Sequence, residues 1–426
     1  MRFIQYIAVG ILTSFYFFPI GFSFLPESVN TKMIIAVLGT LLYGSKCLRI
    51  GQTVVSERIL MIILIACGFS LVSFIATDIN YTTDYSYATY FASLGVWLAG
   101  AFTVCSAIKT VHGEATFKLL TLYLAAVCFV QCVLALMIDN IPSFQLFIDS
   151  YVQQGQQFFT EVDRLYGIGA ALDPAGVRFS IVLIMIVGLL CKDVNVRRSR
   201  IQIFLLLLSF FTITIVGNII SRTTILGVGC AALYFIFSSG LFRNVVRYDS
   251  IKLGLWFAGM LIISVGVASF LYQTDDVFRE HMRFAFEGFF NWAETGVWRT
   301  DSTDKLNREM WIWPTDLKTW VIGSGLFGNW AYGTDIGYCR FILYCGIIGF
   351  SVFAFLFIYL TVIFIHQNPT YWLLFMFLMV LTFLIWIKVS TDIFLIYALF
   401  FCLDRFADEP IKEEDYENNL QYSSHI

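Results

Sequence analysis

The sequence predicts an all-α polytopic membrane protein with about 12 transmembrane helices and a long outward loop between spans 9 and 10. Hydrophobic residues make up 58% of the 426 residues, charged residues make up 13%, and the mean hydropathy is +0.77. A soluble domain could not hide that much apolar surface in a core, so the composition indicates an integral membrane protein. Two further observations support this class: a series of long apolar runs, and one long polar stretch over residues 273–336.

A membrane-spanning helix needs about 20 apolar residues, because each residue adds about 1.5 Å and the hydrocarbon core is about 30 Å thick. About 12 runs meet or approach this length. In chain order they are Phe3–Phe24, Lys32–Leu48, Arg58–Ala76, Tyr87–Ile108, Phe117–Ile138, Leu172–Cys191, Ile201–Ile219, Thr223–Leu241, Ile251–Tyr272, Gly337–Ile365, Thr370–Ile387 and Ser390–Leu403. The first run has no small-residue cleavage site after it, so we expect a retained span and not a removed signal peptide.

Basic residues fall in alternate connections between these runs. They are Lys46, Arg49 and Arg58, then Lys109 and Lys118, then Lys192, Arg197, Arg198 and Arg200, then Arg243, Arg247 and Lys252. Because short basic connections stay in the cytoplasm, we expect both termini there and the two long loops, 139–171 and 273–336, outside. These loops belong to a single transmembrane domain, residues 1–405. An acidic cytoplasmic tail, residues 406–426, follows it.

Three arginines lie at the predicted outer ends of spans. Arg178 is near the start of the sixth span, Arg222 is in the turn between the seventh and eighth, and Arg340 opens the tenth. An arginine in a bilayer is costly, so one that persists usually faces a partner or a polar cavity. The alternative is that each simply lifts its guanidinium to the headgroup region. Together with Arg308 of the long loop, the arginines suit a diphosphate, whose oxygens match the guanidinium fork.

The remaining motifs predict neither a dinucleotide site nor a metal site, and they offer one candidate for a general base. Gly323–Gly328 matches GxGxxG, but no β-strand precedes it, so we interpret it as a tight turn and not as a dinucleotide site. The four histidines are scattered, and the ten cysteines show no CxxC pair, so we expect no metal and no other cofactor. Asp335, just before the tenth span, is the best-placed candidate for a general base, although it could equally be a solvated acid or a helix N-cap.

The order of several short motifs is similar to that of a known family. The chain has Ser221-Arg-Thr223, then Asn307-Arg-Glu-Met-Trp311, Gly323-Ser-Gly325, Thr334-Asp-Ile-Gly-Tyr-Cys-Arg340 and Gly346-Ile-Ile-Gly349. This order resembles the O-antigen polymerase and O-antigen ligase superfamily of bacterial surface-polysaccharide enzymes. The resemblance covers the topology of the whole chain, but the motifs are confined to residues 172–349.

The resemblance implies roles for particular residues. Ligases of this superfamily use an arginine after a serine, a loop arginine near a tryptophan, and a later histidine. Arg222 and Arg308 match the arginines, whereas Asp335 stands where the histidine is expected, which favours the polymerase branch. The implied catalytic residues are Asp335, Arg308 and Arg222. The implied diphosphate ligands are Arg178, Arg222 and Arg340, and the implied glycan contacts are Trp311, Trp313 and Tyr338.

The function that the resemblance implies is a metal-independent polysaccharide polymerase. It would join undecaprenyl diphosphate-linked oligosaccharide repeat units into O-antigen or capsular polysaccharide, on the outer leaflet of the bacterial cytoplasmic (inner) membrane. Lipid-linked donor and acceptor glycans, the bilayer, a chain-length regulator and a flippase are the expected partners, and nucleic acid is not.

Two alternatives stay open. One is a ligase that passes the glycan to a lipid or protein acceptor. The other is a polysaccharide transporter or flippase without chemistry, which predicts polar residues spread along several spans. Here charge gathers at the outer edge, with Lys388 and Asp392 as the main exceptions, and we expect these two to pair on one helix face because they lie four residues apart.

Overall fold

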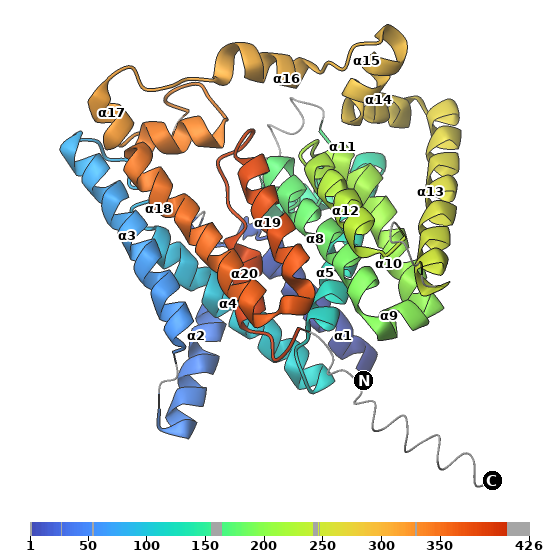
Figure 1. The fold of residues 1–426 in the computed structure, drawn as a ribbon, viewed down its shortest axis with the longest axis horizontal. Coiled ribbons are helices and arrows are strands. Elements are labelled where there is room, and N and C mark those ends of the chain that lie inside the picture. Colours follow the sequence, from blue (N-terminus) through green and yellow to red (C-terminus); the bar gives the residue numbers. More distant parts are fainter. Residues whose placement is uncertain are drawn as a thin grey trace.

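The computed structural model describes residues 2–26, 28–52, 55–154, 164–241, 246, 248–328 and 330–406, and most of them are helical. Eight helical segments in this part of the chain are long and apolar enough to cross a membrane, and they form one bundle (Figure 1). They are α2 (Thr31–Ile50), α3 (Glu57–Ile79), α4 (Tyr90–His112), α5 (Phe117–Asn140), α8 (Leu172–Lys192), α10 (Arg200–Thr212) with its continuation to Ile220, α13 (Tyr248–Thr274) and α18 (Gly337–Gln367). The predicted all-α class agrees with this architecture.

The other four predicted spans are helical but shorter, so the structure does not confirm twelve full spans. They contain α1 (Arg2–Phe17), α12 (Thr224–Ser238), α19 (Trp372–Ile385) and α20 (Phe394–Phe401). The predicted Phe3–Phe24 run is too long because Pro19 has no N–H to continue the helix. The predicted Ser390–Leu403 run shrinks to the eight residues of α20, which extend only about 12 Å.

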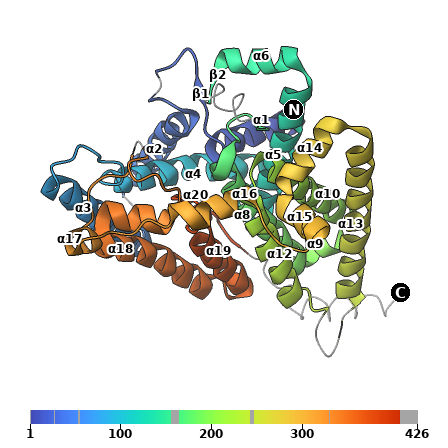
Figure 2. The same ribbon diagram turned by 90° about the horizontal axis from the view of Figure 1, so that it is seen from above.

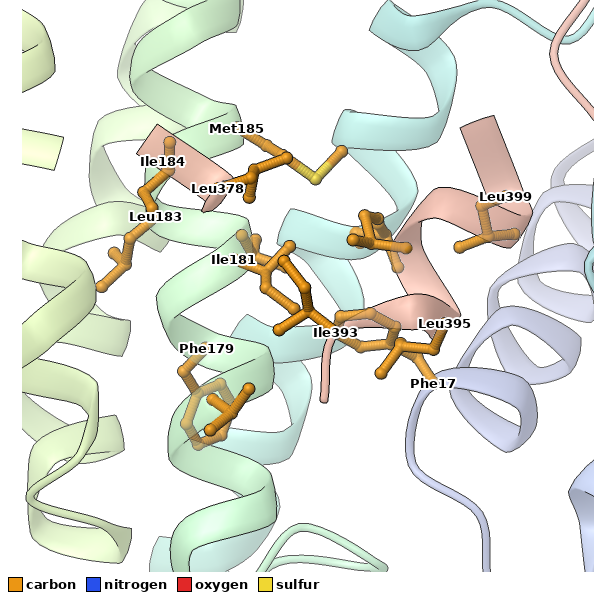
Figure 3. Close-up of a cluster of buried hydrophobic side chains, with 14 of the residues drawn as sticks. Phe17, Phe179, Ile181, Leu183, Ile184, Met185, Leu378, Ile393, Leu395 and Leu399 are labelled. Atoms are coloured by element: carbon orange, nitrogen blue, oxygen red, sulfur yellow. The ribbon is translucent and has the colours of Figure 1, made fainter. Parts of the chain in front are cut away.

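Helix α8 lies at the centre of the bundle. Every residue from Ala175 to Cys191 is buried except Arg178, as expected for a helix that is apolar on all sides. Its side chains meet those of α1, α19 and α20 in one apolar core (Figure 3). On its other side α12 approaches so closely that a Cβ on Gly227 would lie 2.2 Å from the Cα of Ser180.

The long loop covers one end of the bundle. It contains α14 (Asp276–Ala285), α15 (Glu287–Thr295), α16 (Asp301–Lys305), the π-helical turn η2 (Leu306–Met310) and α17 (Leu317–Val321). It runs across the top of Figure 1 from α13 to α18. The second predicted outer loop carries α6 (Pro142–Tyr151) and β2 (Val152–Gln153), which pairs with β1 (Gly21–Phe22) near the same end (Figure 2).

Most of the basic connections lie at the other end of the bundle. The α2–α3, α4–α5 and α8–α10 connections gather there with the N-terminus (Figure 1). Arg405, near the end of the described chain, pairs there with Glu114 at 2.6 Å. Arg243, Arg247 and the predicted acidic tail from 407 onward lie outside the described residues. The two ends of the bundle therefore differ in charge, as the sequence predicts.

The glycine-rich stretch supports a break in α18. Gly346 has φ +65°, which interrupts the helix and leaves carbonyls of the preceding turn without their usual donors. The backbone N–H groups of Ser324 and Gly325 donate to Leu343 O at 2.7 Å and to Tyr344 O at 2.9 Å. The GxGxxG stretch therefore packs through its backbone against the break in α18, in agreement with the predicted turn.

Asp84, between α3 and α4, fixes the far end of this stretch. Its carboxylate accepts the backbone N–H of Phe327 at 2.6 Å and that of Gly328. Burial alone would raise the pKa of the Asp84 carboxyl, but hydrogen bonds from Ser86, Gly328 and Phe327 outweigh it and hold the pKa below its usual value. The ionised form of Asp84 therefore binds the loop.

Candidate functional site

A cavity of about 340 Å³ lies between the α11–α12 turn, the long loop and the end of α19. Here α11 is the short helix Asn218–Ile220. The lining combines two cations and one carboxylate with hydroxyl, amide, aromatic and aliphatic side chains. It includes Asn218, Arg222, Thr223, Phe286, Glu287, Phe289, Trp298, Thr300, Ser302, Thr303, Asn307 and Lys388. We call this cavity the polar pocket.

Arg222 links the bundle to the loop. Helix α11 ends at Ile220, and the extended backbone of Ser221 lets Arg222 lie between the two helices. Its guanidinium forms an ion pair with Glu287 and lies 4.3 Å from the centre of the Phe284 ring. The two charged side chains are only 16% and 20% exposed. Little water screens this pair, so it contributes more than an exposed surface pair would.

Two more contacts hold the same part of the loop. The Asn218 amide donates to Ala285 O at 3.0 Å, and the second carboxylate oxygen of Glu287 accepts the N–H of Asp301 at 2.8 Å. Glu287 therefore joins three segments: the α11–α12 turn, the start of α15 and the start of α16. This is the half of the loop that forms the wall of the polar pocket.

Lys388 carries the second positive charge of the pocket. Its Nζ lies 3.2 Å from Asp173 Oδ1 and donates to Thr223 Oγ1 at 3.2 Å. The predicted pairing of Lys388 with Asp392 is wrong, because residues 386–393 are not helical and do not place residues four apart on one face. Asp392 instead accepts the Tyr90 hydroxyl at 3.3 Å and the Phe394 N–H at 2.8 Å.

Arg164 brings a third cation to the group. Its guanidinium lies 5.4 Å from the Phe284 ring, which Arg222 also covers. Burial lowers the pKa of Arg164, Asp173 opposes that change, and the neighbouring Arg222 adds to it. We call Arg164, Asp173, Arg222, Glu287 and Lys388 the charged cluster. Counted over the described residues of the cluster, three cations against two carboxylates leave one excess positive charge, which favours an anionic ligand.

The other predicted arginines lie elsewhere. Arg308 is exposed, with its Nε 3.4 Å from Asp304 O, although its neighbour Asn307 lines the pocket. Arg178 lies over the Phe18 ring at 5.6 Å, within electrostatic range of Lys32. Arg340 donates to Phe327 O at 2.7 Å and lies 4.0 Å from its ring centre. Of these four described arginines, only Arg222 lines the polar pocket.

Asp335 and the predicted glycan contacts are also separated from the pocket. Asp335 is exposed and lies near Arg340, outside the described lining of the pocket. Trp311 and Trp313 stack at 5.8 Å in a ladder with Trp320, and both are exposed on the loop surface. The Tyr338 hydroxyl donates to Phe383 O at 2.9 Å, and its ring packs on Trp386, so this structure gives Tyr338 a packing role.

The sequence prediction missed four members of the charged cluster as site residues: Arg164, Asp173, Glu287 and Lys388. Lys388 carried a usable signal, since it is a base inside an apolar segment. Arg164 and Glu287 carried none, because each lies in a polar loop where a single charge is ordinary.

Among the described residues, no group of three His, Cys, Asp or Glu side chains could hold a metal ion. No protein-family model, no curated protein and no solved structure matches the chain.

Proposed function

We propose that the protein is a membrane glycosyltransferase that polymerises undecaprenyl diphosphate-linked oligosaccharide repeat units into a surface polysaccharide. The observation that carries the proposal is the charged cluster at the end of an apolar bundle, three of whose members, Arg222, Glu287 and Lys388, line a pocket together with hydroxyl, amide, aromatic and apolar side chains. Guanidinium and ammonium groups bind diphosphate oxygens, and hydroxyl, amide and aromatic side chains bind sugars. The order of the sequence motifs around Arg222 supports the same family of reactions.

The proposal includes the position of the chain in its membrane. Twelve segments of unequal length lie in the bacterial cytoplasmic membrane, and the four short ones reach only part of its depth. Both termini face the cytoplasm, and the long loop faces outward. This orientation rests on the basic residues at the opposite end of the bundle.

In the proposed reaction, the diphosphate of the donor takes the place of Glu287 beside Arg222 and Lys388. An acceptor hydroxyl oxygen attacks the anomeric carbon of the donor. The bond from that carbon to the diphosphate oxygen breaks, and the diphosphate leaves with the electron pair. The released Glu287 carboxylate accepts the hydroxyl proton. Glu287 is favoured over Asp335 for this step because it lines the pocket.

The test is elongation of a purified lipid-linked repeat unit by the purified protein, with no other enzyme present. We expect products of several repeats from the wild type. Arg222→Ala should reduce elongation by about 10²- to 10³-fold, since it removes a donor to the departing charge, and Arg222→Lys should retain part of the rate. Lys109→Ala serves as the control, because Lys109 pairs with Asp404 at the exposed surface at the opposite end of the bundle.

Two outcomes would contradict the proposal. A wild-type protein that elongates nothing is not a polymerase. An Arg222→Ala variant that elongates normally would separate the reaction from the polar pocket. Transfer of a finished glycan to another acceptor, without elongation, would instead indicate a ligase.

A further inference from the structure

A second and larger cavity, of about 910 Å³, lies beside the polar pocket. It is bounded by α10 and α12 on one side and by α13 on the other, with α14 and α15 over its upper end. Figure 1 shows α13 at the edge of the bundle, and Figure 2 shows α14 and α15 over its inner side. No described residue that lines this cavity carries a charge. We call it the lateral groove.

Aromatic contacts near its middle and at its end help to hold α13 to the rest of the protein. Near the middle, Phe257 packs on Phe235 with ring centres 4.4 Å apart, and at the end Tyr272 stacks on Phe290 at 5.5 Å. Fifteen residues separate these contacts along α13, a distance of about 22 Å. Between them α13 turns small side chains such as Ala258 and Ala268 toward the groove. The groove therefore runs along much of the apolar thickness of a bilayer, about 30 Å.

The groove and the polar pocket are adjacent and share part of their wall. Phe286 and Phe289 line both cavities, and Glu287, which binds Arg222, lies between these two residues in the chain. A ligand with an anionic head and one long apolar chain matches this arrangement. Its head meets the excess positive charge of the cluster, and its chain replaces lipid or water in the groove.

We propose that the lateral groove binds the isoprenoid chain of the lipid whose diphosphate lies at the charged cluster. This inference rests on the proposed function for the identity of the head group. Helices α14 and α15 cover the upper end of the groove, which adjoins a single cationic pocket. This arrangement fits a lipid with one anionic head and one apolar chain. A bilayer phospholipid would have to place two acyl chains behind one head group.

The first test is photolabelling with a glycan-free polyisoprenyl diphosphate that carries a photoreactive group along its chain. We expect labelled peptides from α12 and α13 on their groove sides. Ala258→Trp fills the groove, because Ala258 is an exposed side chain that lines it. It should reduce labelling about tenfold, as expected when one or two methylene groups lose their apolar contact.

Val267→Trp is the matched control, since Val267 is on α13, is 53% exposed and lies outside the described lining of the groove. Its labelling should equal that of the wild type. A photoreactive phosphatidylglycerol should label the groove weakly. Equal labelling of the groove by both lipids, or no effect of Ala258→Trp, would overturn the proposal.

A second measurement separates this inference from the proposed function. With lipid-linked repeats on long and on short isoprenoid chains, Ala258→Trp should raise the KM only for the long chain. Unchanged KM values for both substrates would contradict binding of the isoprenoid chain in the groove but would not contradict the polymerase activity. Specific photolabelling of the groove without any elongation by the wild type would support the lipid-binding groove and contradict the polymerase activity.

Discussion

Glu287 occupies the position beside Arg222 that an anionic ligand would need. Its two carboxylate oxygens bind the Arg222 guanidinium and the Asp301 N–H, which are the kinds of donor that bind phosphate oxygens. A diphosphate can therefore enter only by displacing this carboxylate. The displacement frees Glu287 at the moment when a proton acceptor is required. In the proposed reaction, one side chain thus fills the pocket in the free protein and serves as the base in the occupied one.

Replacing Glu287 by Gln should separate these two roles. Gln keeps the shape and can still accept the Asp301 N–H, but it no longer neutralises Arg222. We expect inorganic pyrophosphate to bind about tenfold more tightly, because one competing charge is gone. Elongation should fall about 10²- to 10⁴-fold with loss of the base. Thermal unfolding with increasing pyrophosphate measures the first effect, and product length measures the second.

Glu294→Gln is the control for this change, since Glu294 pairs with Arg283 at 2.6 Å on the exposed side of the loop. It should leave both measurements at wild-type values. Weaker pyrophosphate binding by Glu287→Gln would show that Glu287 helps to build the anion site and does not compete for it.

Two helical segments of the bundle are broken. Helix α18 breaks at Gly346, and residues 386–393 separate α19 from α20. Irregular backbone at membrane depth is tolerated only where protein or a polar cavity surrounds it. Both conditions occur here: Ser324 and Gly325 satisfy carbonyls at the first break, and Lys388 of the second lines the polar pocket. The break between α19 and α20 thus contributes directly to the polar pocket, whereas the break in α18 is satisfied by the glycine stretch.

Replacing Gly346 by Ala tests the support of α18. The residue has φ +65°, and an added Cβ would lie 2.2 Å from Val321 O, a backbone atom that cannot move alone. We expect the free energy of unfolding to fall by about 2–4 kcal/mol, from backbone strain and displacement of the glycine stretch. Intrinsic tryptophan fluorescence during thermal unfolding in detergent reports the loss.

Gly266→Ala in α13 is the matched control, because no atom lies within 4 Å of its added Cβ and its backbone is helical. It should leave the free energy of unfolding unchanged or raise it by about 0.5–1 kcal/mol. Equal stability of the two variants would contradict the structural role assigned to the break.

At the scale of the whole molecule, the sequence predicted what depends on local composition. Apolar runs located a helix in all twelve predicted segments, and basic residues separated the two ends of the bundle. Hydropathy alone overestimated the lengths of α1 and α20, because Pro19 ends the first helix and a polar connection replaces helix before the second. The charged cluster was only partly predictable. Arg222 stands out between spans, but its partner Glu287 and the Lys388–Asp173 pair depend on contacts between distant segments.

The unequal charge of the two ends predicts the orientation of the molecule in the membrane. The basic connections should remain in the cytoplasm, because moving a cluster of cations across the bilayer costs free energy. Two single-cysteine substitutions test this orientation. Gln52→Cys changes an exposed residue of the α2–α3 connection, and Leu317→Cys changes a residue of α17 that is 80% exposed. A membrane-impermeant maleimide should label Leu317→Cys in intact cells and Gln52→Cys only after permeabilisation, each measured above the wild-type signal from native cysteines. The reverse pattern would place the polar pocket in the cytoplasm, where a glycan already exported to the outer leaflet could not reach it.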